Sequence, residues 1–265
     1  MELSDRKALL KKIIADKGSM LVAFSGGVDS GLLAYLARNL LKEKCRCVLL
    51  DSPVMPRDEI RQAEEIAKNL GLALEIIPAP LMESAHFRGN LKERCYHCKK
   101  ILSGILKKRA EELALSCVAD GLNVTDTGEY RPGIRASDEE GILHPFIEAG
   151  ITKEEIRAIA RENRLPFWDK PSAACLSSRI PYGEEITEKK LLMIEKAEGY
   201  LHRLGIRQLR VRLHGKMARI EADDEGMATI FANKGEVVKV FEEIGFSSVT
   251  LDLAGYRRGS MDETI

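Results

Sequence analysis

Met20-Leu21-Val22-Ala23-Phe24-Ser25-Gly26-Gly27-Val28-Asp29-Ser30 is the segment from which the architecture of this chain can be inferred. Residues 20–24 are apolar and predict a buried strand, and an apolar helical period begins at Val28. Gly26 and Gly27 join the predicted strand to the predicted helix. Glycine lets the backbone approach an anion closely, and the first N–H groups of a helix point toward such an anion. The segment therefore predicts a phosphate-binding loop.

Strands and helices alternate on both sides of this loop. Such alternation predicts an α/β fold, with a parallel sheet and helices on both of its faces. Thr152 and Glu155 form a capping-box pattern that predicts the start of one of these helices. The predicted strands are residues 45–50, 72–77 and 116–119, and the predicted helices are residues 1–17, 28–41, 58–70, 96–115 and 152–163. Residues 120–145 are rich in Gly, Asp, Asn and Arg and are expected to form functional loops.

The pattern changes after a Pro- and Ser-rich stretch at residues 165–183. We expect a nucleotide-binding domain in residues 1–182 and a small α+β domain in residues 183–265, for substrate binding or oligomerisation. The expected elements of the second domain are a helix at 187–204, strands at 208–213, 218–221 and 248–253, and two short helices.

Composition narrows the class of protein. The chain has 265 residues, with 41 Lys and Arg against 41 Asp and Glu, so its formal net charge is zero. This balance argues against a dedicated nucleic-acid binder, which usually carries a basic excess. No apolar run approaches the roughly 20 residues that span a bilayer. We expect a cytoplasmic protein with no membrane partner, and six cysteines in such a protein do not indicate a disulfide framework.

Each residue type in the predicted phosphate loop has a chemical reason to be there. The hydroxyls of Ser25 and Ser30 can donate to phosphate oxygens. Asp29 would repel a phosphate, so it is better explained as a Mg²⁺ ligand. A Walker A motif is absent, because Gly215-Lys216 is followed by Met217. An ordinary glycine-rich turn is the alternative, although the full motif after a predicted first strand disfavours it.

The cysteines fall into two groups. Cys95 and Cys98 form a C-x-x-C at the start of a predicted helix, followed by Lys99, and Cys175 stands alone in the Pro- and Ser-rich stretch. Three cysteines can bind three irons of a [4Fe–4S] cluster and leave the fourth iron open. A zinc site, a redox C-x-x-C and simple packing are alternatives. The candidate fourth zinc ligands are His97, His86 and His144, and the cysteines expected in the core are Cys45, Cys47 and Cys117.

The loop motif resembles that of the PP-loop ATP pyrophosphatase superfamily. The resemblance implies that ATP is cleaved between its α- and β-phosphates while the loop holds the departing pyrophosphate. Asp51 and Ser52 follow the second predicted strand, where such enzymes place the nucleoside. The resemblance therefore implies an ATP site formed by Ser25, Gly26, Gly27, Asp29, Ser30, Asp51 and Ser52.

Longer segments narrow the resemblance to one family. They include Arg94-Cys95-Tyr96-His97-Cys98-Lys99 and Pro171-Ser172-Ala173-Ala174-Cys175-Leu176-Ser177-Ser178-Arg179-Ile180-Pro181-Tyr182-Gly183. The chain resembles the ATP-dependent sulfurtransferases of lactate racemase maturation, which help to build the nickel-pincer nucleotide. The implied reaction adenylates a carboxylate of pyridinium-3,5-biscarboxylic acid mononucleotide and converts it into a thiocarboxylate. Some members of that family sacrifice the sulfur of a single cysteine, and others hold three cysteines and an iron–sulfur cluster, which is the pattern here.

The resemblance also implies roles for individual residues. Cys175, Cys95, Cys98 and Lys99 would serve catalysis, with the three cysteines as cluster ligands. Arg179, Arg210 and Arg212 would bind the anionic substrate, and the spacing of the last two places them on one side of a strand. Exposed arginines on a solvated face are the alternative. Weaker candidates for a metal or acid–base role are Glu198 and Glu221, whereas Arg131 and Arg135 could equally be surface residues.

We therefore expect an enzyme that uses ATP, Mg²⁺ and a [4Fe–4S] cluster. Its expected partners are a small-molecule nucleotide substrate, an external sulfur donor and further copies of itself in a homo-oligomer. Two other classes remain open from sequence. One is a tRNA thiolation enzyme with the same loop, which the zero net charge disfavours. The other is a nucleotide-binding, metal-stabilised module without turnover, which the hydroxyls and Asp29 of the loop disfavour.

Overall fold

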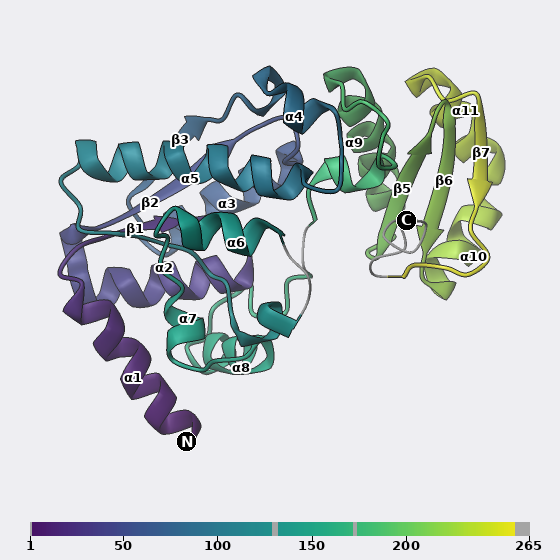
Figure 1. The fold of residues 1–265 in the computed structure, drawn as a ribbon. Coiled ribbons are helices and arrows are strands. Elements are labelled where there is room, and N and C mark those ends of the chain that lie inside the picture. Colours follow the sequence, from purple (N-terminus) through teal and green to yellow (C-terminus); the bar gives the residue numbers. More distant parts are fainter. Residues whose placement is uncertain (1, 129–131, 172–173, 258–265) are drawn as a thin grey trace. The chain divides into compact units, whose positions relative to one another are not determined.

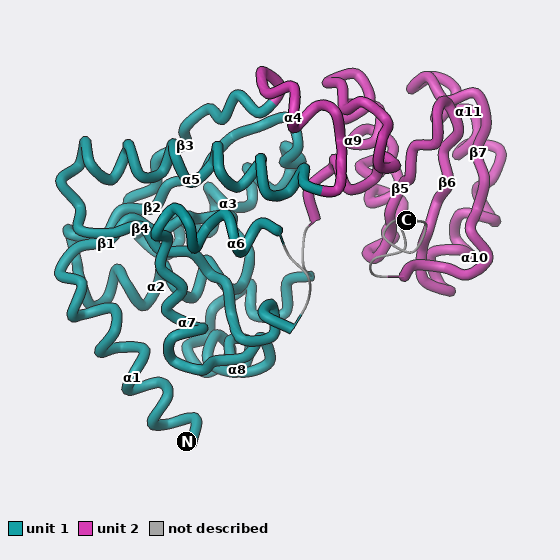
Figure 2. Tube along the Cα trace, in the orientation of Figure 1, with its two compact units in different colours: residues 1–81, 93–173 teal, residues 82–92, 174–265 magenta. Residues whose placement is uncertain are grey.

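The computed structural model describes residues 2–128, 132–171 and 174–257. The chain forms two compact units, shown in Figure 2. Unit 1 is Met1–Leu81 with Glu93–Ala173, and unit 2 is Met82–Lys92 with Ala174–Ile265. The division into functional domains at residue 182 stays a prediction.

Unit 1 contains a parallel sheet of four strands in the order β3-β2-β1-β4 (Figure 1). In the middle of the sheet, Val22 of β1 pairs with Cys47 of β2 and with Ala119 of β4. All the pairings are parallel, so the carboxyl ends of the strands meet at one edge. The strands are β1 (Met20–Ala23), β2 (Cys45–Asp51), β3 (Leu74–Pro78) and β4 (Val118–Ala119).

Helices cover both faces of this sheet, as the alternation of elements predicts. Successive side chains of β1 point to opposite faces. Met20 and Val22 are buried in a core shared with α1 (Leu3–Asp16), α2 (Val28–Leu41), α3 (Arg57–Asn69) and α8 (Lys153–Glu162). Leu21 is buried in a separate core with Leu106 and Ala110 of α5 (Arg94–Glu112). The predicted α/β class is confirmed.

The expected loop region between residues 120 and 145 contains a helix that the sequence pattern does not predict. This helix, α6 (Pro132–Glu139), packs against α5. It opens with Pro132-Gly133 and spans only eight residues, which is too short for the sequence pattern to identify it. A tertiary contact holds it, because the Tyr96 hydroxyl donates to Glu139 Oε2 at 2.6 Å. The other elements of this region are η3 (Val124–Gly128) and α7 (Pro145–Glu148).

Unit 2 contains a mixed sheet of three strands. β5 (Leu209–His214) and β6 (Met217–Ala222) are antiparallel, and β7 (Ser248–Leu251) runs parallel to β6. Asn90 ties the segment 82–92 to this unit, because its Nδ2 donates to the carbonyl oxygens of Pro181 and Glu184 at 2.7 and 3.0 Å. The α-helices in the described part of unit 2 are α4 (Ala85–Arg88), α9 (Glu188–Arg203), α10 (Asp224–Ala232) and α11 (Lys234–Ile244), and a short 3₁₀ helix, η4 (Leu176–Arg179), follows Cys175.

Candidate active site

The predicted phosphate loop joins β1 to α2 at the carboxyl edge of the sheet (Figure 1). The Ser25 N–H donates to Ser30 Oγ at 3.1 Å, and the hydroxyl oxygens of these two serines lie 3.0 Å apart. Gly27 is the N-cap of α2 and makes no side-chain cap. The first N–H groups of a helix have no intrahelical partner, so this loop presents donors to which an anion can bind.

Gly26 and Gly121 allow contacts that a larger residue would block. Gly26 has a φ of +70°, and a Cβ at this position would lie 2.6 Å from Ala63 Cβ on α3. Gly121 follows β4, and a Cβ there would lie 2.7 Å from the Ser30 backbone nitrogen. Both glycines therefore let neighbouring segments pack directly against the phosphate loop. Sequence reasoning selected Gly26 but missed Gly121.

Two lysines that sequence reasoning did not select lie beside the phosphate loop. Lys153, the first residue of α8, forms an ion pair with Asp29. Lys170 Nζ donates to the Gly26 carbonyl oxygen at 3.3 Å and forms an ion pair with Glu59 at 2.8 Å. Each ammonium group is paired with a carboxylate, and both lie where they could also donate to a phosphate oxygen bound at the loop.

The surroundings of Asp29 suit a magnesium ion. Its Oδ2 accepts a hydrogen bond from Lys153, whereas its Oδ1 is buried with no hydrogen-bond partner among the described residues. Burial raises the pKa of the Asp29 carboxyl although Lys153 opposes the shift, and the nearby charge of Asp126 raises it further. A carboxylate oxygen without a partner, close to a second carboxylate, is a donor set that Mg²⁺ can use beside phosphates.

Asp51 and Ser52 lie at the end of β2, which is the strand next to β1. Arg57 forms an ion pair with Asp51 at 2.6 Å and donates to the Ser52 carbonyl oxygen at 2.7 Å. The two residues are thus held at the same sheet edge as the phosphate loop. Their role in nucleoside binding stays a prediction.

Lys99 belongs to a charged cluster built on Asp120, the residue that follows β4. Lys99 Nζ lies 2.9 Å from Asp120 Oδ2, and His144 Nδ1 lies 2.6 Å from Asp120 Oδ1. Burial alone would raise the pKa of Asp120, but the charges of Lys99 and His144 lower it to about 2. Burial lowers the pKa of His144, but the hydrogen bond and charge of Asp120 outweigh this effect and raise it. His144 Nε2 contacts Asp138 at 3.1 Å, so carboxylates engage both ring nitrogens and neither is left for zinc.

The six cysteines are free thiols with different exposure. Cys95 is exposed and Cys98 is half-buried, and both lie near the start of α5, where the helix dipole favours a thiolate. Cys45 and Cys47 are buried in β2, as expected of core residues. Cys117 is only half-buried, and its thiol donates to the Ser19 carbonyl oxygen.

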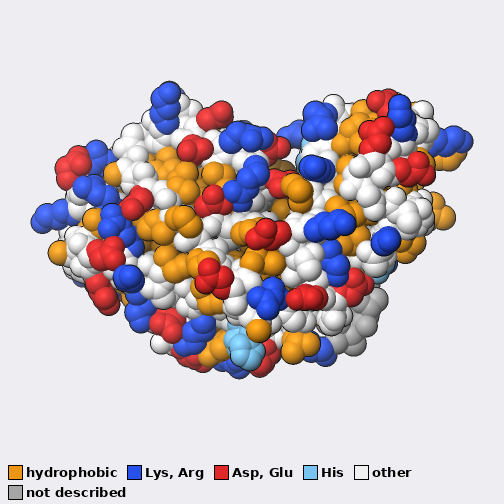
Figure 3. Space-filling model, turned by 90° about the horizontal axis from the view of Figure 1, so that it is seen from above, with side chains coloured by type: hydrophobic (Ala, Val, Ile, Leu, Met, Phe, Trp, Pro, Cys, Tyr) orange, Lys and Arg blue, Asp and Glu red, His pale blue; other side chains and the backbone are white. Residues whose placement is uncertain are grey.

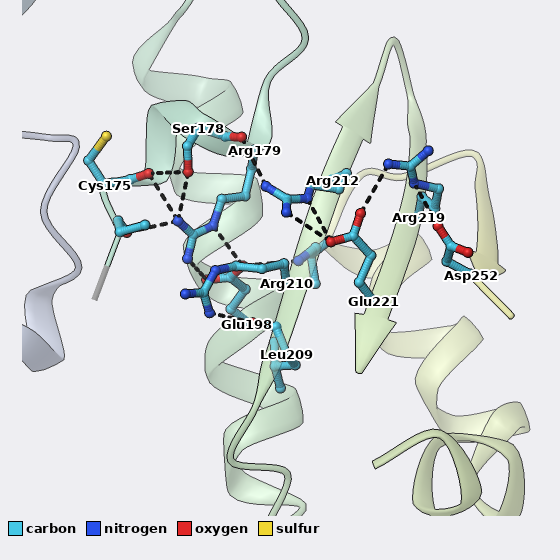
Figure 4. A network of polar contacts seen from close by, with 12 residues as sticks. Cys175, Ser178, Arg179, Glu198, Leu209, Arg210, Arg212, Arg219, Glu221 and Asp252 are labelled. Carbon is cyan, nitrogen blue, oxygen red and sulfur yellow. Dashed lines mark hydrogen bonds and ion pairs between the residues drawn. The ribbon is translucent and has the colours of Figure 1, made fainter. Parts of the chain in front are cut away.

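Cys175 and the three predicted substrate arginines belong to unit 2. Cys175 is exposed, whereas Arg179 and Arg212 are buried in ion pairs with Glu198 and Glu221 at 2.9 and 2.8 Å (Figure 4). Glu198 and Glu221, considered above for a metal or acid–base role, are thus engaged by arginines.

Arg210 has different surroundings. It is half-buried, stacks over the Tyr256 ring at 5.2 Å, and forms no ion pair within the described part of the chain. Burial lowers its pKa, and the nearby charge of Arg179 adds to this effect. A cation in these surroundings is suited to an anionic ligand. Roles for all three arginines in binding substrate stay predictions.

Further residues considered from the sequence are Arg131, Arg135 and other members of the Cys175 motif. Arg131 lies outside the described residues, as do Ser172 and Ala173 of the Cys175 motif. Arg135 is exposed, stacks over Tyr96 at 4.6 Å and contacts Glu139 at 3.7 Å, as expected of a surface residue.

Several features bear on the classes of protein considered above. Within residues 2–128, 132–171 and 174–257, no three His, Cys, Asp or Glu side chains are grouped so that they could hold a metal ion. No helix in this part of the chain combines the length and apolar character that a membrane span requires. Basic and acidic side chains are intermingled on the face drawn in Figure 3.

Comparisons with known proteins place the chain among nucleotide-using enzymes. A family model described as NAD synthase matches residues 2–125. Pyridinium-3,5-bisthiocarboxylic acid mononucleotide synthase of Lactiplantibacillus plantarum is 32% identical over 99% of this chain and 96% of its own length. An uncharacterized protein of Synechocystis sp. is 40% identical over 97% of this chain and 96% of its own length. The glutamine-hydrolyzing GMP synthase of Clostridium perfringens is 25% identical over 73% of this chain and 41% of its own length.

The cluster around Asp120 generates a prediction about the pKa of His144. Asp120→Asn should lower this pKa, because burial then acts on the imidazolium without the charge that opposes it. Asp138→Asn is the matched control and should lower the pKa less, because the Asp138 side chain is 61% exposed. Titration of the histidine ring signals by NMR measures both changes. An unchanged His144 pKa in Asp120→Asn would show that this carboxylate does not control the imidazole.

Proposed function

The chain belongs to the pyridinium-3,5-bisthiocarboxylic acid mononucleotide synthase family and is an ATP-dependent sulfurtransferase, and we propose that it acts on pyridinium-3,5-biscarboxylic acid mononucleotide. The observation that supports this proposal best is the phosphate loop at the end of β1, with Asp29 and two lysines beside it. Helix N–H groups and cations stabilise the charge that develops on departing pyrophosphate.

In the proposed first step, a carboxylate oxygen of the substrate attacks the α-phosphorus of ATP. The bond from this phosphorus to the oxygen that bridges it to the β-phosphorus breaks, which gives an acyl adenylate and pyrophosphate. Ser25 and Ser30 donate to phosphate oxygens, while Lys153 and Lys170 neutralise their charge. Asp29 would hold Mg²⁺, which when bound neutralises phosphate charge further.

In the proposed second step, sulfur attacks the acyl carbon of the adenylate. The bond from that carbon to the oxygen of AMP breaks, and the products are a thiocarboxylate and AMP. We place sulfur delivery at Cys175, with Cys95 and Cys98 as further thiols and Lys99 as a cation on the same helix as these two. Three cysteines are the number that a [4Fe–4S] cluster with one open iron requires, although within the described residues the structure does not group them; such a cluster, when bound, would offer an iron position for a sulfide from an external donor.

The substrate carries two carboxylates and a phosphate, so its site needs cations. Arg210 is the arginine whose surroundings favour this role, because its half-buried guanidinium forms no ion pair within the described residues. A charge-assisted hydrogen bond to a substrate oxygen would satisfy it. A cytoplasmic location, a homo-oligomer and a part for residues 183–265 in substrate binding or oligomerisation complete the proposal.

The adenylation step predicts the products of ATP. Turnover with the mononucleotide should give AMP and pyrophosphate in equal amounts. Asp29→Asn keeps the shape of the side chain and removes its charge, and should slow pyrophosphate release by roughly a hundredfold or more. Asp58→Asn is the matched control, since Asp58 is an exposed residue of α3, and should behave as wild type. ADP as the main product would refute the adenylation step.

The sulfur step predicts a cluster. Anaerobically purified protein should show the broad visible absorption of an iron–sulfur cluster, and the double variant Cys95→Ser, Cys98→Ser should lose it together with sulfur transfer. Cys117→Ser removes a half-buried thiol just before β4 and should keep both the absorption and sulfur transfer. Intact-protein mass spectrometry after turnover tests the sacrificial alternative. Loss of the mass of hydrogen sulfide from Cys175 would show that the cysteine itself supplies the sulfur.

A further inference from the structure

The loop that carries Cys175 has its backbone carbonyl groups turned toward Arg179 (Figure 4). Arg179 Nη1 donates to the carbonyl oxygens of Ala174 and Cys175 at 2.8 and 3.0 Å. It also lies 3.0 Å from Ser178 Oγ, and that hydroxyl donates to the Cys175 carbonyl oxygen at 2.9 Å. The Cys175 sulfur points away from the guanidinium (Figure 4) and lies 3.1 Å from Ser177 Oγ, while Cys175 as a whole is exposed.

Glu198 fixes the other side of the same guanidinium. Its two oxygens accept from Nε and Nη2 of Arg179 at 2.9 and 3.0 Å, and Oε1 also accepts from the Val211 N–H of β5 at 3.0 Å. Arg179 is 3% exposed and Glu198 is 6% exposed. Glu198 thus fixes Arg179 against α9 and β5. The guanidinium of Arg179 donates to Glu198 on one side and to the loop carbonyl groups on the other.

Arg212 makes the same two kinds of contact as Arg179, with a buried glutamate and with a backbone carbonyl group of the loop. Its Nη1 donates to the Ser178 carbonyl oxygen at 3.0 Å, while Nε and Nη2 donate to Glu221 Oε2 at 3.0 and 2.8 Å. Glu221 is fully buried, and its second oxygen accepts from Arg219 at 3.0 Å. Two arginines therefore hold one short loop from two sides, each backed by a buried carboxylate.

A direct role for Arg179 or Arg212 as a substrate cation conflicts with these contacts. Arg179 could turn to a substrate anion only by breaking its ion pair with the buried Glu198, which is strongly unfavourable. Arg212 would have to give up both hydrogen bonds to the fully buried Glu221, which would then be held by Arg219. Either arginine would also release the loop carbonyl groups that it holds. Arg210 donates to the carbonyl oxygen of its neighbour Leu209 at 2.6 Å but forms no ion pair within the described residues, so it can turn to an anion without breaking an ion pair with a buried glutamate.

We propose that Arg179 and Arg212 are positioning residues that hold the Cys175 loop with its thiol turned outward, and that Glu198 and Glu221 act through them. This inference rests on the proposed function, in which Cys175 takes part in sulfur delivery. The fork of an arginine is needed at both positions, because a lysine cannot donate to a glutamate and to the loop carbonyls in the same planar geometry. Arg210 is left as the arginine of the three that binds the substrate.

The decisive variant is Glu198→Gln, which removes the charge that fixes Arg179 but keeps the size of the side chain. Thiocarboxylate formation should fall about tenfold or more, as expected for loss of a charge-assisted hydrogen bond. The KM for the mononucleotide and the rate of pyrophosphate release should stay near wild type. Arg210→Ala should instead raise that KM. Glu188→Gln, the same change at an exposed position of α9, is the matched control.

Hydrogen exchange followed by mass spectrometry gives a readout that does not depend on turnover. In Glu198→Gln the peptide that covers residues 174–180 should exchange faster, while peptides from β1 keep wild-type rates. Arg212→Lys is a second variant with the same expected pattern, in case the first folds poorly. Unchanged exchange of this peptide, or a raised KM with normal kcat in Glu198→Gln, would overturn the inference. Absence of pyrophosphate release by wild type would refute the proposed function, and the exchange experiment would still decide whether the arginines hold the loop.

Discussion

No side chain can stand at Gly26, and the active edge of unit 1 depends on this constraint. The backbone there has a positive φ, and α3 approaches so closely that a Cβ would clash with Ala63. Because the turn is this tight, the chain leaves β1 and enters α2 with the helix start at the sheet edge. Gly121 brings the loop after β4 against the same turn. The turn between β1 and α2, helix α3 and the loop after β4 therefore meet at the phosphate loop.

Ion pairs between lysines and carboxylates are the second feature that organises this edge of the sheet. Lys153 is paired with Asp29, Lys170 with Glu59 and Lys99 with Asp120. Each of these three lysines therefore has its charge balanced by a neighbouring carboxylate. In unit 2 the same principle has another use, because Glu198 and Glu221 fix arginines whose other donors hold backbone carbonyl groups.

The sequence predicts the fold well where the pattern is local. The period of α2, the capping box of Thr152 and the apolar strands are set by neighbouring residues, and the structure confirms all three. The family resemblance is confirmed by similarity over nearly the whole chain. Pairings across long separations could not be predicted in this way. Lys153 is one of many lysines until folding brings it to Asp29, and nothing local shows that Arg179 pairs with Glu198. The short helix α6 was missed for the same reason, since contacts with α5 stabilise it.

The proposed reaction adenylates a substrate carboxylate before sulfur replaces AMP. The oxygen that joins the acyl group to AMP then comes from the substrate and leaves with AMP when sulfur attacks the acyl carbon. Mass spectrometry of the AMP formed from a mononucleotide whose carboxylates carry ¹⁸O tests this order of steps. We expect AMP that contains one ¹⁸O atom. AMP without ¹⁸O, formed together with the thiocarboxylate from the labelled substrate, would contradict adenylation of the carboxylate.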